Sequence, residues 1–297
     1  MVSQYLERVG KSKMDNKKII DKVAQCLVEA STKFRDDQIE KYKEAIAKEK
    51  NLEARWVLEN ILEDAWVAES KKMPLCDDTG IPHVFIEFGE DVAIDSKIEN
   101  AVKEGVRVGL ENLPGRPMAV RGNDIERIAQ SAGLYKESGA LLSAPIIFRS
   151  FPGKGLQVTV MMLGGGPEIR SKTLRVFHKH DSKNVIYQVA QWAKEVSGQL
   201  GCTPCVPAIG IGRTHYEATV LMLEAMKEGN LNNQSEYEEL VTGIVNESKI
   251  GPLGLGGNTT ALGSFIKIGE QRASGVRIAC MRPGCCFDPR RATFKIS

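Results

Sequence analysis

The stretch Pro74-Leu75-Cys76-Asp77-Asp78-Thr79-Gly80 places a thiol, two carboxylates, a hydroxyl and a glycine directly before an apolar run. Short polar side chains and glycine favour a turn, and residues 83–88 have the composition of the strand that follows it. A turn at the end of a strand can direct several small functional groups into one cleft. The simpler interpretation is an Asp-rich surface turn beside a buried cysteine, and these residues alone do not decide between the two.

The composition of the 297 residues is that of an ordinary globular protein, with 42% hydrophobic and 26% charged residues. Lys and Arg number 40 against 38 Asp and Glu, a balance that does not suggest a protein of nucleic acids or membrane surfaces. No apolar run reaches the roughly 18 residues of a membrane helix, and the N-terminus lacks the apolar core of a secretory signal. We therefore expect a cytoplasmic protein in a reducing compartment.

Hydrophobic periodicity around the opening stretch predicts a mixed α/β fold. No Gly or Pro interrupts residues 15–73, and apolar residues recur there at helical spacing, which predicts a helical N-terminal layer over residues 1–72. Residues 73–297 alternate loosely between strand and helix patterns, which predicts a β-sheet with surrounding helices and glycine-rich loops. Because we find no internal repeat and no domain boundary, the prediction is one domain over residues 1–297.

Individual elements follow from the same patterns. The predicted helices cover residues 98–110, 184–200, 216–228 and 235–249. The predicted strands cover residues 84–88, 207–211, 276–281 and 293–296. Residues 145–151 and 156–162 are also β-rich, and Pro152-Gly153-Lys154-Gly155 separates them, which predicts a β-hairpin.

The seven cysteines, at positions 26, 76, 202, 205, 280, 285 and 286, do not have the spacing of a disulfide framework. In a reducing compartment, packing, metal ligation or catalysis explains them better. Cys26 lies in an apolar helical pattern and is assigned to the core. One alternative is a non-catalytic scaffold subunit whose zinc site uses Cys202, Cys205, Cys280 and Cys285. Another is an iron–sulfur cluster held by three thiols from distant segments, with one iron open as a Lewis acid.

Two glycine-rich segments can place bare backbone N–H groups against an anion. The first is Gly164–Gly166, with Arg170 and Lys172 close behind it, and the second is Gly251–Thr260. Neither has the pattern of a phosphate-binding loop or a dinucleotide fingerprint, so we do not expect a nucleotide site. Carboxylate binding is open for both segments. The alternative is two tight turns whose glycines satisfy backbone geometry alone.

The order of these segments resembles the α subunit, or N-terminal half, of the iron–sulfur class I fumarate hydratases and tartrate dehydratases. The resemblance covers residues 15–297, and the joint pattern of motifs is specific although each motif is weak. The matching segments are Cys76–Gly80 (C-Q-D-T-G in the family), Gly164–Gly166 with Arg170-Ser171-Lys172, Cys205-Val206-Pro207, Gly251–Ala261 and Cys286–Ala292.

This resemblance implies a [4Fe–4S] cluster whose protein ligands are Cys76, Cys205 and Cys286, with the fourth iron available to substrate. Arg116 stands where the family has an arginine that binds a substrate carboxylate, a task that suits the forked guanidinium. Asp78 is implied to orient or activate the catalytic base. The other implied substrate contacts are Asp77, the backbone N–H groups of Gly165 and Gly166, and Lys172.

The implied reaction is the reversible removal of water from a small 2-hydroxy dicarboxylic acid, with malate or fumarate as the first candidate and tartrate as the second. We find no catalytic base in this chain, and the family takes it from a second domain or a β subunit. The implied protein is thus half an enzyme that works with a β subunit, as an (αβ)2 complex or around an α homodimer.

Two positions depart from the family pattern. Asn258 stands where relatives often carry lysine, and Asp77 replaces a neutral glutamine. An ionised Asp77 would repel both an anionic substrate and an anionic cluster. It is therefore protonated, turned away, or a mark of another substrate. A further alternative is a degenerate member of the family that binds a carboxylic acid without turnover.

Overall fold

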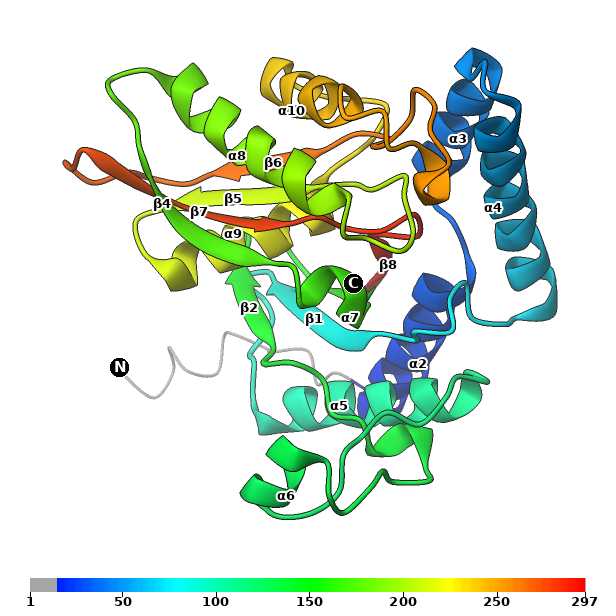
Figure 1. Ribbon diagram of the computed structural model, residues 1–297. Helices are drawn as coiled ribbons and strands as arrows, with labels where there is room; N and C mark the ends of the chain where they lie inside the picture. The colour runs from blue at the N-terminus through cyan, green and yellow to red at the C-terminus, as the bar shows by residue number, and fades with distance from the viewer. Residues whose placement is uncertain (1–14, 297) are drawn as a thin grey trace. The chain divides into compact units, whose positions relative to one another are not determined.

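The computed structural model describes residues 15–296, and Figure 1 shows their helices and strands. The chain divides into two compact units, each assembled from separate segments. Unit 1 comprises the chain up to Lys33, the segment Ala68–Leu163 and the chain from Arg290 onward. Unit 2 comprises Phe34–Val67 and Gly164–Pro289. The mixed α/β class is confirmed. Folding as one domain stays a prediction.

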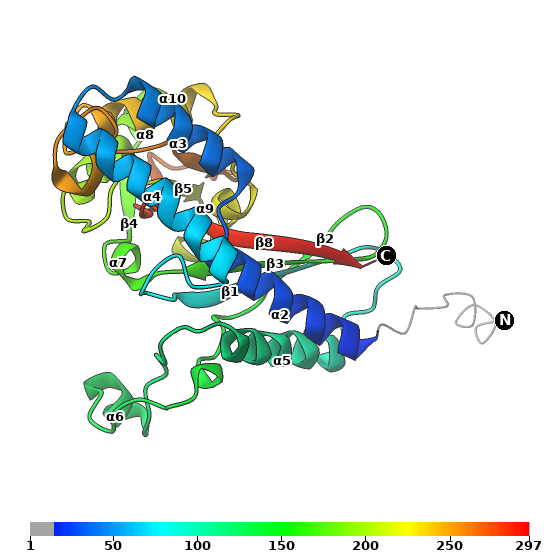
Figure 2. The ribbon, with the colours of Figure 1, turned by 90° about the vertical axis from the view of Figure 1, so that its right-hand side faces the viewer.

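Unit 1 contains a four-stranded sheet covered by two helices. The strand order is β2 (Ile147–Ser150), β1 (Ile81–Phe88), β3 (Leu156–Leu163) and β8 (Arg290–Ile296). The helices are α2 (Asn16–Thr32) and α5 (Ser96–Asn112), which lie side by side (Figure 2). Gly105 permits their close contact, because a Cβ atom there would stand 2.6 Å from the Cβ of Val23. The buried faces of both helices and the apolar side chains of the sheet form one core.

The predicted hairpin between residues 145–151 and 156–162 is wrong. Its two strands, β2 and β3, do not pair with each other, because β1 lies between them. β2 runs parallel to β1 and β3 runs antiparallel to it. The glycine turn bonds instead to the chain after β1, since Gly89 and Glu90 donate to the carbonyls of Gly155 and Gly153, each over 2.9 Å. A glycine turn between two β-rich runs therefore did not establish their pairing.

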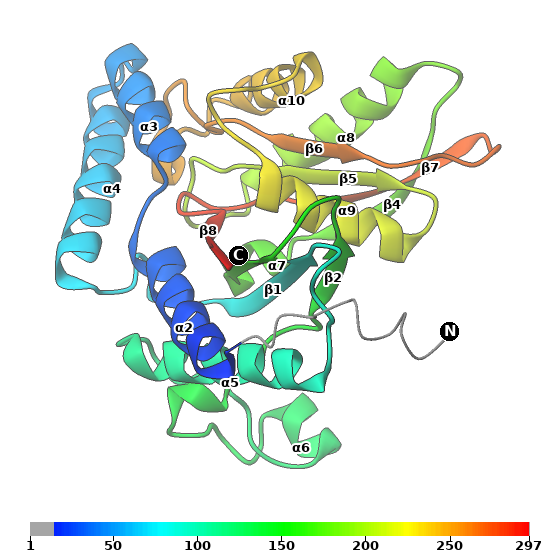
Figure 3. The ribbon, with the colours of Figure 1, turned by 180° about the vertical axis from the view of Figure 1, so that it is seen from behind.

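Unit 2 contains the second sheet, with helices on both faces (Figure 3). The strand order is β4 (Lys172–Phe177), β7 (Val276–Arg282), β5 (Ala208–Gly212) and β6 (Phe265–Ile268). One face shares a core with α8 (Ser182–Ser197) and α10 (Glu236–Asn246). The other packs on α9 (His215–Glu228), where Gly210 has no room for a side chain because its Cβ would lie 2.0 Å from the Ala218 carbonyl oxygen.

The remaining elements are short or lie outside the two cores. In unit 1 the connection after α5 carries α6 (Asp124–Ala129), of which no residue is buried, and the 3-10 turn η1 (Ser138–Ala140). Unit 2 also holds α3 (Asp36–Lys48), α7 (Gly165–Glu168), the 3-10 turn η2 (Pro252–Gly254) and most of α4 (Leu52–Lys71). Within residues 15–296, every helix is too short or too polar to span a membrane.

Candidate active site

All seven cysteines are thiols, and four of them gather in unit 2. The loop that carries Cys202 and Cys205 lies beside the turn that carries Cys285 and Cys286, and the Cys286 N–H donates to the Cys202 carbonyl over 3.1 Å. Cys205, Cys285 and Cys286 are buried, whereas Cys202 is half-buried. The loop of Cys205 is also fixed on its other side, since its N–H donates to the Thr260 carbonyl over 2.8 Å.

Burial and the neighbouring thiols make ionisation of Cys205 and Cys286 unfavourable. Burial raises the pKa of Cys205 to about 12, and the neighbouring Cys285 and Cys202 add to the shift. Hydrogen bonds to Cys202 and Cys285, together with burial, raise the pKa of Cys286 well above its ordinary value. Thiolates are the form that ligates metals, and a bound cation would favour the ionised form of these two sulfurs.

One helix holds the turn that follows Cys286. Tyr42 of α3 is fully buried and donates its hydroxyl to the Cys286 carbonyl over 2.7 Å. Gln38 donates to the carbonyls of Phe287 and Asp288, each over 3.3 Å, and Arg35 donates to the carbonyl of Pro289. Three side chains from the first turns of α3 thus bind four consecutive carbonyl groups. We call them the α3 clamp.

The sequence predicted a helix here but not the clamp. Its only signal was the spacing of Arg35, Gln38 and Tyr42, which puts three hydrogen-bond donors on one side of a helix.

A buried ion pair supports the same turn from within unit 2. Arg282 and Asp288 are both fully buried, and their side chains meet at 2.6 Å. Asp288 also accepts the Cys285 N–H over 3.2 Å, while Arg282 donates to the Gly164 carbonyl over 2.8 Å. Burial alone would lower the pKa of Arg282, but the Asp288 carboxylate outweighs it and raises the pKa. This pair links the Cys285–Cys286 turn to the first glycine segment.

The first glycine segment forms the N-terminal end of α7. The two basic residues that follow it, Arg170 and Lys172, make different contacts. Gly166 has open space where a side chain would stand. Arg170 donates to the Gly166 carbonyl over 2.9 Å and so stabilises the loop itself. Lys172, a predicted substrate contact, lies on β4 with its ammonium 5.8 Å from the centre of the Trp192 ring. The substrate contacts of Gly165, Gly166 and Lys172 stay predictions.

The second glycine segment binds a carboxylate of the protein itself. Glu49, directly after α3, accepts the Asn258 N–H over 2.7 Å. Its other oxygen accepts the N–H groups of Lys50 and Asn51 over 2.9 and 3.0 Å. Burial alone would raise the pKa of Glu49, but these backbone hydrogen bonds outweigh it and lower the pKa. In this segment the backbone N–H of Asn258 therefore binds a carboxylate of the same chain, where the sequence left the binding of an external carboxylate open.

In unit 1 the opening stretch forms a turn before β1. Asp77 and Arg116 form an ion pair of 3.2 Å, with 86% and 54% of their side chains exposed. The Asp78 carboxylate accepts the N–H of Gly80 over 3.2 Å. Cys76 is half-buried in the same turn. Unit 1 thus brings together Cys76, Asp77, Asp78 and Arg116, while unit 2 places Cys205 and Cys286 in one cluster of thiols with Cys202 and Cys285.

The four cysteines of the zinc alternative do not form a single-ion site. The Cys280 thiol lies on β7 and accepts the Thr219 hydroxyl over 3.6 Å. No group of three His, Cys, Asp or Glu side chains in the described part of the chain is placed around one metal ion.

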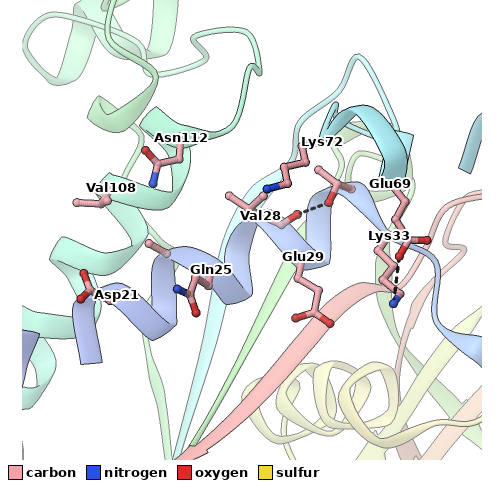
Figure 4. Close-up of a pocket in the computed structure, with 11 residues that line it drawn as sticks. Asp21, Gln25, Val28, Glu29, Lys33, Glu69, Lys72, Val108 and Asn112 are labelled. Carbon is pink, nitrogen blue, oxygen red and sulfur yellow. Dashed lines mark hydrogen bonds and ion pairs between the residues drawn. The ribbon is translucent and has the colours of Figure 1, made fainter. Parts of the chain in front are cut away.

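A cleft of about 690 Å³ in unit 1 contains none of the predicted site residues (Figure 4). It is lined by α2, α5 and the end of α4, with Asp21, Lys33 and Glu69 among its charged residues. Lys33 and Glu69 form an ion pair of 3.1 Å. Its mixed charge gives no preference for an anionic ligand.

Comparison with known proteins gives matches over nearly the whole chain. The profile of a family described as Fumarate hydratase (Fumerase) matches residues 20–295. A Methanocaldococcus jannaschii protein, provisionally named L(+)-tartrate dehydratase subunit alpha, is 29% identical over 290 residues, covering 94% of this chain and 98% of its own length. The L(+)-tartrate dehydratase subunit alpha of Escherichia coli K12 is 24% identical over 285 residues, covering 94% and 91%.

Proposed function

Because the chain belongs to the fumarate hydratase (Fumerase) family of hydro-lyases, we propose that it is the alpha subunit of a [4Fe–4S] enzyme that works with a beta subunit. Its substrate is a small 2-hydroxy dicarboxylic acid, with malate or fumarate first and tartrate second. The family description supports the first choice, and the names of the relatives support the second. A reducing cytoplasm suits its thiols.

The observation that carries this proposal is the gathering of thiols in unit 2, where Cys205 and Cys286 both lie near Cys202 and Cys285. Both thiols are buried, and their loops are fixed by backbone hydrogen bonds, the α3 clamp and the Arg282–Asp288 pair. Cysteine sulfur is the usual ligand of iron–sulfur clusters, so this donor set fits the group. Cys76 of unit 1 would be the third ligand. When bound, the cluster would supply a Lewis-acidic iron without a cysteine ligand.

The residues of the chain would bind and orient the substrate. Arg116 would hold a carboxylate of the substrate with its forked guanidinium. That guanidinium contacts Asp77 in the structure, so substrate and Asp77 would compete for it. Asp78 would orient the base that removes the C–H proton, and the base itself would come from the beta subunit. The N–H groups of Gly165 and Gly166 would bind the second carboxylate, with Lys172 nearby.

Anaerobic reconstitution tests the ligand set. The chain should bind about four iron and four sulfide, with the broad visible absorption of a [4Fe–4S] cluster. Cys76→Ser, Cys205→Ser and Cys286→Ser should each lose the cluster. Cys280→Ser is the matched control, because Cys280 is also buried but its thiol contacts Thr219. Full cluster content in Cys286→Ser would refute the assignment.

Activity is then measured with a co-expressed beta-type subunit from the same genome. (S)-Malate, fumarate and L(+)-tartrate are the probes, and fumarate is followed by its ultraviolet absorption. If the reconstituted complex turns over none of them, the chain is better described as a member of the family that binds a carboxylic acid without turnover.

A further inference from the structure

Arg290 is a buried arginine to which neither the resemblance nor the mechanism above gives a role. It is the first residue of β8, and only 2% of it is exposed. Its Nη1 atom donates to the carbonyls of Asp78 and Thr79, over 2.9 and 3.2 Å. A Cβ atom on Gly80 would lie 2.8 Å from its Nη2 atom. The guanidinium therefore lies directly against the turn that carries Asp78.

The sheet of unit 1 explains how a residue so distant in sequence reaches this turn. Arg290 pairs with Met162 of β3, and the next residue of β3, Leu163, pairs with Ile81 at the start of β1. The beginning of β8 thus lies two strands away from the end of the turn. A long side chain spans that gap, and successive residues of a strand face opposite sides. Arg291 therefore faces away from Arg290.

The charge of Arg290 is not neutralised by the described residues. No acidic side chain within residues 15–296 forms an ion pair with it, and its Nε atom has no hydrogen-bond partner. A buried cation is costly unless it is paired. The positive charge beneath the Asp78 turn therefore favours a negative charge close to that turn.

We propose that Arg290 is a positioning residue for Asp78. By holding the carbonyls of Asp78 and Thr79, it fixes the two peptide planes that follow Asp78, and with them the direction of its carboxylate. Its charge also makes the turn more favourable for an anionic substrate. This inference rests on the proposed function, in which Asp78 orients the base.

The test uses the reconstituted complex with its beta-type subunit, (S)-malate and L(+)-tartrate. Arg290→Lys keeps the charge but not the planar fork. A general acid–base step contributes roughly 10²–10⁴-fold, and we expect Arg290→Lys to lose part of it, about 10- to 100-fold in kcat. KM should change less than threefold, because the charge is retained. Arg291→Gln is the matched control on the opposite face of β8 and should keep kcat within about twofold.

A double variant distinguishes positioning from a general structural role. If Arg290 acts through Asp78, then Arg290→Lys should slow an Asp78→Asn enzyme by less than about twofold, since coupled residues are not additive. Additive losses, or loss of the iron–sulfur absorption in Arg290→Lys, would overturn the proposal. If the wild-type complex is active but the kcat losses of Arg290→Lys and Asp78→Asn are additive, this inference alone is refuted. An inactive wild-type complex would instead refute the proposed function.

Discussion

Glu49→Gln should destabilise unit 2 although glutamine has nearly the same shape as glutamate. Glu49 is only 5% exposed, and both oxygens of its carboxylate accept backbone hydrogen bonds. The Asn258 N–H and Nδ2 groups donate to it over 2.7 and 3.4 Å, and Lys50 and Asn51 donate over 2.9 and 3.0 Å. A glutamine can keep one acceptor oxygen, but it places an NH2 group against a backbone donor on the other side.

The expected cost follows from these contacts. A hydrogen bond to a charged group contributes about 1.5–3 kcal/mol, and an unsatisfied buried donor costs about 1–3 kcal/mol. Because glutamine preserves one side of the contact, we expect the free energy of unfolding to fall by about 2–3 kcal/mol at pH 7. Unit 2 is affected because Glu49 joins the end of α3 to the second glycine segment.

The effect should depend on pH with a defined sign. The pKa of Glu49 in the folded chain is lowered from its ordinary value of 4.5. Its contribution to stability is therefore fully present above that ordinary value and is lost as pH falls through the lower folded-state pKa. The difference between the wild type and Glu49→Gln should be constant from pH 6 to 8 and shrink progressively below about pH 4.5.

Urea unfolding of the apoprotein, followed by tryptophan fluorescence, measures this difference. Glu63→Gln is the matched control, because Glu63 is an exposed glutamate of α4. It should change the unfolding free energy by less than about 0.5 kcal/mol. If Glu49→Gln changes no more than this control, or if its effect persists undiminished at acid pH, the carboxylate contact described above is wrong.

Three further substitutions test other contacts. Tyr42→Phe leaves the buried Cys286 carbonyl without its hydroxyl donor, so the unfolding free energy should fall by about 1–2 kcal/mol. A chelator should also remove iron from the variant several-fold faster, and an unchanged rate would contradict a role of the α3 clamp in holding the cluster loop. Asp77→Gln removes an exposed ion pair worth about 0–1 kcal/mol, so KM for (S)-malate should fall by up to about fivefold. A higher KM would argue that Asp77 contacts the substrate and does not compete with it for Arg116. Ile128→Ser should leave thermal unfolding nearly unchanged, because this side chain of α6 is 84% exposed, whereas a clear loss of stability would reveal packing of α6.

Local patterns predicted the elements whose signals are contained in a short window. The apolar periodicity of residues 98–110 became α5, and that of residues 184–200 became α8 with slightly different ends. The apolar run after the opening turn became β1, although the strand begins at Ile81. Missed elements had weak signals: α6 buries no side chain, and β4 is mostly exposed. Periodicity reports burial, so elements with little burial are hard to predict.

The local sequence patterns could not predict contacts between residues that are far apart in the chain. The pairing of β1 with both β2 and β3 depends on the whole sheet, whereas the hairpin prediction used only a turn between two neighbouring runs. The bond between Tyr42 and Cys286 joins residues 244 positions apart, and the bond between Glu49 and Asn258 joins residues 209 apart. No motif links such positions. The sequence suggested the first half of each contact, a helix or a glycine loop, but not its partner.

The interleaved segments of the two units set an order for biosynthesis. β3 ends at Leu163 and β8 begins at Arg290, so the ribosome makes most of unit 2 between two neighbouring strands of unit 1. The edge of β3 that pairs with β8 therefore stays unpaired while residues 164–289 are synthesised, and unpaired strand edges favour aggregation. The same interval separates the Asp78 turn from the guanidinium that holds it. A nascent chain halted before residue 290 should consequently be captured by chaperones through unit 1 rather than unit 2.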